Sequence, residues 1–300
     1  MRIIRTFIIL FMIFVLGCFV GLFLLFRTSP EEQGDLIAVL KLQGIIVNYE
    51  DEENTIDINQ VIKTLEKIEK SKKYKGILLV VDSPGGMAAP SLELTYKIKK
   101  IKETKPVIAY IQNLGASGAY YFSSAANWII ANPQSIIGSI GVIISVPQVY
   151  KALDKIGIEM INIKSGKYKD SLSPFKPLTK DQKDYFQNLV MEYYYQFVKD
   201  VAENRNLKTQ KQIQELYEIA DGRVFTYKTA LKYRLIDQVG TIDNAKEKMK
   251  EILKNDKIKF VEIKLYKKTP LEKILGSKEN ISIKSFEKFL HHYGVWMIMF

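Results

Sequence analysis

The sequence predicts an α/β fold, in which helices pack on a parallel sheet and one N-terminal transmembrane helix precedes them. Short apolar runs at residues 36–42, 76–81 and 106–111 are typical of strands that are buried on both faces of a sheet. Helical or turn segments separate these runs, which is the order of a parallel α/β unit. An uncharged apolar run at residues 7–26 predicts the membrane helix.

The composition allows one large domain with appendages. The 300 residues are 47% hydrophobic, which is enough for a packed core. The net charge is +11, from 44 basic and 33 acidic residues, and no recognised nucleic-acid-binding motif is present. We therefore expect anionic lipid rather than nucleic acid as the partner of the basic residues.

A single cysteine excludes an internal disulfide. Neither a metal nor a cofactor is expected, because the adjacent His291 and His292 have no cysteine or carboxylate at ligand spacing.

Residues 1–27 are expected to form a membrane anchor. Twenty helical residues extend about 30 Å, the thickness of the hydrocarbon core of a bilayer. Arg2 and Arg5 precede the apolar run, so we expect a single pass through the cell membrane with the N-terminus in the cytoplasm and the main domain outside. Two alternatives remain open, namely a cleaved secretory signal and a lipoprotein signal processed at Cys18.

The first part of the main domain predicts alternating strands and helices. Apolar residues at a spacing of three or four, as from Ile58 to Ile68, indicate a helix, and continuous apolar runs indicate strands. In order, the expected elements are a strand at 36–42, a helix from 58, a strand at 76–81, a helix at 91–103, a strand at 106–111 and a helix at 119–126.

The second part of the chain is richer in lysine. We expect a helix at 147–156, a strand at 158–163, a polar loop at 164–170, a long helix at 179–204, a short strand after Asp221, a helix at 227–235, and a helix and a strand within 246–268. The main domain is expected to cover residues 36–265, and residues 266–300 form a tail of unknown structure. The apolar end of the tail is too short to span a bilayer, and contact with the membrane surface, packing on a neighbour and disorder all remain open.

Two glycine-containing turns predict a reaction site at the carboxyl ends of neighbouring strands, where α/β folds gather reactive groups. Ser117 lies between Gly115 and Gly118 at the start of a helix, where its hydroxyl can meet a passing substrate backbone. Gly85 and Gly86 can point unhindered N–H groups at a carbonyl oxygen as negative charge develops on it. Taken alone, each turn is also typical of tight helix–strand packing.

A serine hydroxyl becomes a nucleophile only when a base removes its proton, and both histidines of this chain stand near the C-terminus. A neutral lysine replaces histidine where burial lowers the lysine pKa by several units. The polar loop supplies Lys169 for this role, with Lys164 and Lys167 as alternatives. Ser139 supplies a second hydroxyl that can orient the uncharged amine.

Together these segments resemble the signal peptide peptidase A family in its short, single-domain, membrane-anchored bacterial form. The resemblance covers most of the chain from residue 36 to about 239, and its motifs follow the order of the family. They are DSPGG at 82–86, GASGAYY at 115–121, ANP at 131–133, GSIGV at 138–142, KSGKYKD at 164–170 and DGRV at 221–224. Two positions depart from the pattern, Asp82 where the family more often has asparagine and Ala119 where it more often has glycine.

The resemblance implies a Clp/crotonase-like fold and a Ser-Lys dyad. It implies that Ser117 is the nucleophile, Lys169 the general base and Ser139 the serine that supports the lysine. Gly85 and Gly86 match the oxyanion loop. The single-domain members of the family assemble into rings in which the serine and the lysine of one site come from adjacent subunits, so the resemblance also implies a homo-oligomer.

The expected function is that of a membrane-anchored serine endopeptidase, which cleaves remnant signal peptides or other apolar peptides through an acyl-enzyme. A related Ser-Lys membrane protease of the kind that is paired with band-7 proteins is an alternative. A crotonase-like enzyme acting on acyl-CoA would instead need a glutamate base and no anchor. A non-catalytic membrane scaffold that keeps the fold is the third alternative.

Overall fold

The computed structural model describes residues 12, 14–17, 35–49, 54–265 and 296–299. The chain divides into two compact units, residues 1–35 and residues 36–300. In the first unit, residues 12 and 14–17 are helical and exposed. Most of the predicted anchor, residues 7–26, lies outside the described residues, and among those that are described no helix has both the length and the apolarity that crossing a bilayer requires.

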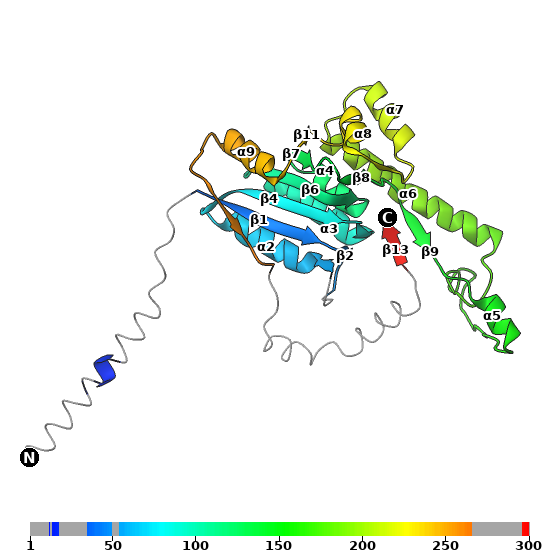
Figure 1. Cartoon of the computed structure of the whole chain (residues 1–300). Coiled ribbons are helices and arrows are strands. Elements are labelled where there is room, and N and C mark those ends of the chain that lie inside the picture. The colour runs from blue at the N-terminus through cyan, green and yellow to red at the C-terminus, as the bar shows by residue number, and fades with distance from the viewer. Residues whose placement is uncertain (1–11, 13, 18–34, 50–53, 266–295, 300) are drawn as a thin grey trace, which may run out of the picture. The chain divides into compact units, whose positions relative to one another are not determined.

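The second unit is built on an eight-stranded sheet with the order β10-β8-β6-β4-β1-β12, and β7 pairs with both β6 and β11 (Figure 1). All of its pairings are parallel except that of β10 with β8. The strands are β1 (Leu36–Gln43), β4 (Tyr74–Ser83), β6 (Val107–Ala116), β7 (Trp128–Ala131), β8 (Ile136–Gly138), β10 (Val224–Phe225), β11 (Gln238–Val239) and β12 (Lys259–Glu262).

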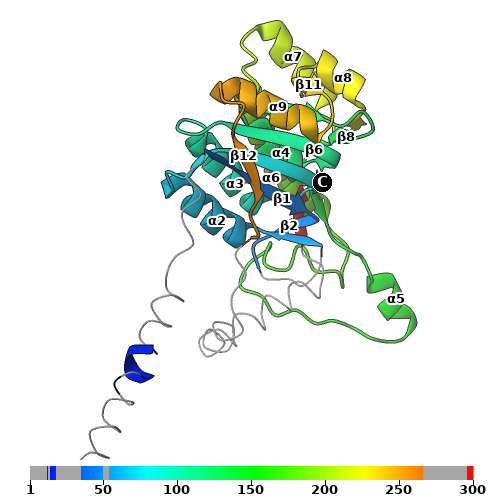
Figure 2. The ribbon, with the colours of Figure 1, turned by 60° about the vertical axis from the view of Figure 1, so that its left-hand side comes forward.

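Helices cover both faces of this sheet, which is why its strands are continuously apolar. Along β4, Ile77 and Leu79 pack into one core and Leu78 and Val80 into the other. The first core is closed by α2 (Ile58–Lys70), α3 (Ala88–Ile101), α4 (Gly118–Ser124) and α6 (Lys180–Asn204), and the second by α9 (Ile242–Leu253), which lies on the opposite side of the sheet (Figure 2). The predicted α/β fold with a parallel sheet is therefore confirmed.

The long helix α6 begins where the sequence predicts. Thr179 accepts a hydrogen bond from the Gln182 backbone N–H, and the Gln182 side chain accepts one from the Thr179 backbone N–H, which makes a capping box. The shorter helices are α5 (Tyr150–Lys155), α7 (Gln210–Ile219) and α8 (Tyr227–Lys232).

The predicted strand at residues 158–163 is wrong. These residues form no regular secondary structure and all are exposed. They belong to a projecting segment, residues 147–170, that carries α5 away from the sheet and contains no buried residue; we call this segment the arm (Figure 1). A strand needs a neighbour for its backbone N–H and C=O groups, and the arm has no strand of the described chain beside it.

A second sheet lies beside the ends of the main strands. Its order is β3-β2-β5-β13-β9, formed by Thr55–Asp57, Ile45–Val47, Gly86–Met87, Trp296–Met299 and Ile143–Ser145. The strands β2, β3 and β5 pair in parallel, whereas β13 is antiparallel to both β5 and β9. Residues 296–299 of the predicted tail therefore form a strand, and the rest of the tail lies outside the described residues. The predicted domain boundaries at 27, 36 and 265 stay predictions.

Candidate active site

Ser117 lies at the turn between β6 and α4. Its backbone has φ 54° and ψ −123°, a conformation that costs a residue with a Cβ atom about 1–3 kcal/mol. Two hydrogen bonds of 2.8 Å hold the turn, one from the Ser117 N–H to the Gly138 carbonyl and one from the Tyr121 N–H to the Ser117 carbonyl. The side chain is fully buried, and its Oγ finds no hydrogen-bond partner among the described residues. The strained turn thus presents an unengaged hydroxyl.

The first turn of α4 is fixed from behind by α6. The Tyr121 hydroxyl donates to one carboxylate oxygen of Asp200, and Gln196 Nε2 donates to the other at 2.9 Å. The Tyr121 ring also stacks on Phe197, with centroids 4.3 Å apart. Burial and the bond to Asp200 raise the pKa of the Tyr121 hydroxyl, so it stays a protonated donor. Because the Tyr121 N–H holds the Ser117 carbonyl, this contact helps to fix the position of the serine.

The two glycines of the first turn lie against the serine turn. A Cβ atom on Gly85, which has φ 100°, would lie 2.8 Å from Ser117 Cβ, and one on Gly86 would lie 2.3 Å from the Ile46 carbonyl oxygen. Only glycine fits both positions. The Gly85 N–H already donates a hydrogen bond to Ser83 Oγ at 3.1 Å, so it is less available as a donor to a substrate oxygen. The oxyanion role of Gly85 and Gly86 stays a prediction.

Ser139 follows β8, the strand next to β6. Its backbone N–H donates to the Arg223 carbonyl at 2.9 Å, and its φ is 50°. Because Ala116 pairs with Gly138 in the parallel register, Ser117 and Ser139 each stand one residue beyond the end of neighbouring strands. The main sheet therefore brings the two serines and the glycine turn to the same edge.

The lysines of the arm differ in their ion pairs. Lys164 contacts Asp170 at 2.6 Å, and Lys176, which follows the arm, contacts the same carboxylate at 2.7 Å. Lys167 contacts Asp181 of α6 at 2.6 Å. The hydrogen bond to Asp181 raises the pKa of Lys167, which makes its neutral form scarcer. Within the described part of the chain, Lys169 makes neither an ion pair nor a side-chain hydrogen bond.

The structure does not bring Lys169 to the serines within one chain. Lys169 is exposed near the end of the arm, and no hydrogen bond or ion pair of the described residues joins it to Ser117 or Ser139. The assignment of Lys169 as the base stays a prediction.

The sequence places Gly118 beside Ser117 but gives no sign of its contact with Ser91. A Cβ atom on Gly118 would lie 2.2 Å from Ser91 Oγ and 3.0 Å from Ser91 Cβ, so glycine is needed for α3 and α4 to pack closely behind the serine turn. Ser91 Oγ itself donates to the Met87 carbonyl at 2.8 Å. Nothing in the helical pattern of residues 91–103 marks Ser91.

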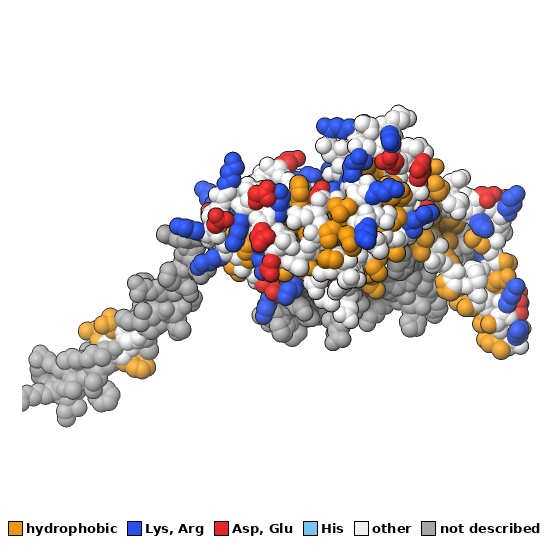
Figure 3. All heavy atoms as spheres, turned by 45° about the horizontal axis from the view of Figure 1, so that its top comes forward, with side chains coloured by type: hydrophobic (Ala, Val, Ile, Leu, Met, Phe, Trp, Pro, Cys, Tyr) orange, Lys and Arg blue, Asp and Glu red, His pale blue; other side chains and the backbone are white. Residues whose placement is uncertain are grey.

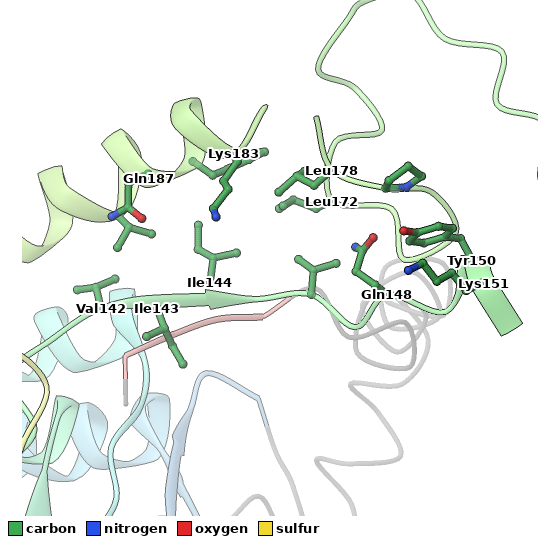
Figure 4. A pocket seen from close by; sticks show the side chains of 14 residues that line it. Val142, Ile143, Ile144, Gln148, Tyr150, Lys151, Leu172, Leu178, Lys183 and Gln187 are labelled. Atoms are coloured by element: carbon green, nitrogen blue, oxygen red, sulfur yellow. The ribbon is translucent and has the colours of Figure 1, made fainter. Parts of the chain in front are cut away.

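A cavity of about 800 Å³ lies between β9 and the first half of α6 (Figure 4). Its lining is mainly apolar and includes Ile144, Val146, Leu172, Leu178 and Phe186. Figure 4 shows Ile144 pointing toward α6 and Ile143 pointing away from it. The cavity is therefore suited to apolar side chains of a ligand that lies along β9.

The comparisons with known proteins identify a family. The family model described as "Peptidase family S49" matches residues 99–256, more than half of the chain, and this stretch contains Ser117, Ser139 and Lys169.

Three relatives show the extent of the similarity. The Methanocaldococcus jannaschii protein named "Putative protease MJ0651" is 42% identical over 196 residues, which are 65% of this chain and 62% of that protein. The Enterococcus faecium "Putative signal peptide peptidase SppA" is 32% identical over 250 residues, 77% of this chain and 72% of the relative. The Arabidopsis thaliana "Serine protease SPPA, chloroplastic" is 35% identical over 237 residues, 76% of this chain but only 34% of the relative. The chain thus belongs to peptidase family S49, the family of the signal peptide peptidase A proteins that its motifs resemble.

Proposed function

We propose that this chain is a membrane-anchored serine endopeptidase of the signal peptide peptidase A type, with a Clp/crotonase-like domain. Its substrates would be remnant signal peptides or other apolar peptides. The observation that carries the proposal is the buried, unengaged hydroxyl of Ser117, held in a strained turn against Gly85 at the carboxyl end of β6.

The proposed chemistry is acyl transfer. Ser117 Oγ attacks the scissile carbonyl carbon while the neutral amine of Lys169 takes the hydroxyl proton. Backbone N–H groups of the glycine turn stabilise the oxyanion. The Gly85 N–H also donates a hydrogen bond to Ser83 Oγ, so the N–H groups of Gly86 and Gly118 act beside it as donors to the oxyanion. The leaving amine takes the proton from protonated Lys169 as the peptide C–N bond breaks. The neutral Lys169 amine then takes a proton from a water molecule that attacks the acyl carbon, and returns it to Ser117 Oγ as the ester bond breaks and the acid product leaves.

We propose that the dyad forms between two copies of the chain. Lys169 lies on the arm, and the arm exposes apolar side chains that one chain leaves in solvent, as Figure 3 shows at the projecting end of the molecule. The most exposed are Ile156, Ile161 and Ile163, at 68%, 79% and 100%. An exposed apolar segment of this kind is typical of a subunit contact. Burial in that contact would supply the dry surroundings that a lysine needs to act as a base.

We propose that residues 7–26 anchor this assembly in the cell membrane, with the N-terminus in the cytoplasm and the peptidase domain outside. The uncharged run and the two preceding arginines support this orientation. Apolar signal peptides left in the same bilayer would then be near the site, and surface lysines would contact anionic lipid.

Peptide cleavage by the full chain in detergent tests the dyad. We expect Ser117→Ala and Lys169→Ala to abolish cleavage of an apolar signal-like peptide, whereas Lys164→Ala and Lys167→Ala retain it. A fluorophosphonate probe should label the wild type but not Ser117→Ala. Cleavage that survives in Lys169→Ala would reject this lysine, and absence of Ser117 labelling would favour a scaffold.

Mixing the two inactive variants tests whether the site is shared. If Ser117 of one subunit meets Lys169 of the next, random co-assembly of equal amounts of Ser117→Ala and Lys169→Ala restores about a quarter of wild-type activity, because one contact in four joins an intact serine to an intact lysine. A dyad formed within one chain would give no recovery.

A further inference from the structure

The lysines of the main domain gather at one edge of its sheet. Between residues 36 and 150, ten of the twelve basic residues lie in two short segments, 67–75 and 97–105. The first segment spans the end of α2 and the start of β4, and the second spans the end of α3 and the turn before β6. Because β4 and β6 are parallel, both segments lie at the edge where the strands begin, opposite the edge that carries Ser117 (Figure 1).

Contacts join the two segments into one surface. Lys97 Nζ lies 2.6 Å from Glu69 Oε2, and Lys105 Nζ donates a hydrogen bond to the Ile68 carbonyl at 2.7 Å. A third segment with lysines leads from α9 into β12, the strand on the other side of β1. The three segments together, which we call the basic edge, are residues 67–75, 97–105 and 251–259.

The basic edge carries most of the net charge of the chain. It contains 13 lysines and four acidic residues, a net charge of +9, against +11 for all 300 residues. Nine of the 13 lysines are exposed. Like charges also lie close together here, because burial lowers the pKa of the Lys102 amine and the neighbouring Lys99 and Arg205 lower it further. An anionic partner would relieve this repulsion.

The edge that carries Ser117 has the opposite character. The sequence contains neither lysine nor arginine in residues 42–62, 76–96 and 106–150, which include the turns after β1, β4, β6, β7 and β8. Arg223, whose carbonyl holds Ser139, is paired with Asp221. Positive charge is therefore segregated away from the candidate site.

The chain enters the main domain at the basic edge. Leu36, the first residue of β1, lies opposite Tyr74 on one side and Lys259 on the other. Its N–H donates to the Lys73 carbonyl at 3.2 Å. Nine residues of sequence separate Leu36 from the predicted anchor at residues 7–26. The basic edge is therefore the part of the domain that follows the anchor most directly.

We propose that the basic edge is a docking surface for the anionic lipid headgroups of the membrane that holds the anchor, and that it turns the serine edge away from the bilayer. This inference rests on the anchoring that belongs to the proposed function. The observation that carries it is the gathering of lysines at the edge where β1 begins. Each lysine near an anionic membrane surface favours binding about fivefold, so several together suffice to orient a tethered domain.

This orientation sets the height of the candidate site. The strand β4 connects the two edges and has ten residues, so it extends about 33 Å. With the basic edge on the headgroups, Ser117 stands about this far from the bilayer. A substrate peptide that keeps one end in the bilayer would need about ten extended residues to reach the serine.

Energy transfer from a dye on the chain to dye-labelled lipid headgroups tests which edge faces the bilayer. The full-length chain, as Cys18→Ser, carries the donor dye either at Thr104→Cys on the basic edge or at Gln134→Cys beyond the end of β7. Both positions are exposed, and neither change removes a lysine. In vesicles with about 30% anionic phospholipid, we expect greater transfer from residue 104, because it lies about 30 Å nearer the headgroups. Equal transfer from the two positions would overturn the proposal.

Charge reversal tests whether the lysines supply the attraction. Lys72→Glu together with Lys100→Glu reverses two exposed charges of the basic edge, and Lys180→Glu together with Lys228→Glu makes the same change on α6 and α8. We expect the first pair, and about 0.5 M salt, to lower transfer from residue 104 to its value in purely zwitterionic vesicles. The second pair should have no effect, and thermal unfolding checks that both pairs fold. Undiminished transfer in the first pair would overturn the proposal.

Flotation with vesicles separates this inference from the proposed function. A chain that floats with zwitterionic vesicles but shows equal transfer from the two dye positions in anionic vesicles keeps its anchor and has no docking surface. A chain that floats only with anionic vesicles, with greater transfer from residue 104, has the docking surface without the anchor. Ser117→Ala should give the same transfer as the wild type, because docking does not depend on cleavage. Binding of a nucleic-acid duplex that the first pair abolishes, without any response to anionic lipid, would assign the basic edge to nucleic acid and overturn the proposal.

Discussion

At the scale of single residues, the candidate site depends on close backbone approach as much as on reactive side chains. Gly85 lies against Ser117, and Gly118 lies against Ser91. Neither contact leaves room for a Cβ atom. The serine turn is therefore held by residues whose contribution is the absence of a side chain.

We expect Gly118→Ala to destabilise the chain by about 1–3 kcal/mol, because the new methyl group would overlap the Ser91 side chain. Peptide cleavage should fall with it, since the serine turn must shift. Urea unfolding measures the change in the free energy of unfolding. Gly166→Ala is the matched control, because a Cβ atom there meets nothing within 4 Å. A loss below about 0.5 kcal/mol in Gly118→Ala would contradict this packing.

The sequence predicts candidate reactive residues but not their surroundings. Ser117, Gly85 and Gly86 were identified because glycine-flanked turns after apolar strands have a distinct local pattern. Ser91 and the bond from Tyr121 to Asp200 depend on contacts between α3, α4 and α6, which are far apart in the sequence and follow no periodicity. The ion pairs of Lys164 with Asp170 and of Lys167 with Asp181 also have no signal in the sequence.

At the scale of elements, the arm shows why a local pattern can mislead. Apolar residues such as Ile158, Met160 and Ile161 predicted a strand, but strand formation needs a partner edge, and the described part of the chain places none there. The core strands were predictable because helices of the same chain cover both of their faces. The tail strand β13 was not, because its partners, β5 and β9, lie at least 150 residues earlier in the sequence.

The loop that carries Lys169 is ordered by Asp170, which accepts from Lys164 and Lys176. These lysines hold the pKa of the Asp170 carboxyl well below its ordinary value. A carboxyl whose pKa is lowered by folding stabilises the structure above its unfolded pKa and loses this contribution only as the pH falls through the folded pKa. We therefore expect the hydrogen-exchange protection factors of residues 164–177 to persist as the pH falls from 7 through about 4.

Asp170→Asn should lower these protection factors about tenfold at neutral pH and remove their dependence on pH below about 4, because no carboxylate remains to be protonated. Asp154→Asn, an exposed position on the same arm, is the control. Equal protection in wild type and Asp170→Asn would show that the ion pairs do not order the loop.

At the scale of the whole molecule, the arm is the segment whose apolar side chains a single chain leaves exposed. The main sheet and its helices bury their apolar residues, whereas residues 147–170 bury none. A chain that assembles through this segment would cover it and would place Lys169 near the site of a neighbour.

We expect Ile161→Asp together with Ile163→Asp to break the assembly and to reduce peptide cleavage at least tenfold. The folding of each chain should be unchanged, because these side chains are 79% and 100% exposed in the single chain. Sedimentation measures the assembly, and thermal unfolding measures the fold. Ile252→Asp, which places one such carboxylate on α9, should leave the assembly intact. An unchanged assembly in the double variant would contradict a role of the arm in subunit contact.

The backbone of Ser117 has a consequence for heat resistance. Glycine adopts φ 54° and ψ −123° without the clash that a Cβ atom causes, so Ser117→Gly should relieve the strain and give a dead enzyme whose melting temperature is a few degrees above that of the wild type. Ser117→Ala keeps the Cβ atom and should show no such gain, and equal melting temperatures for the two variants would count against the strain. Natural selection would then be retaining, at this one position, the residue that makes the protein less durable.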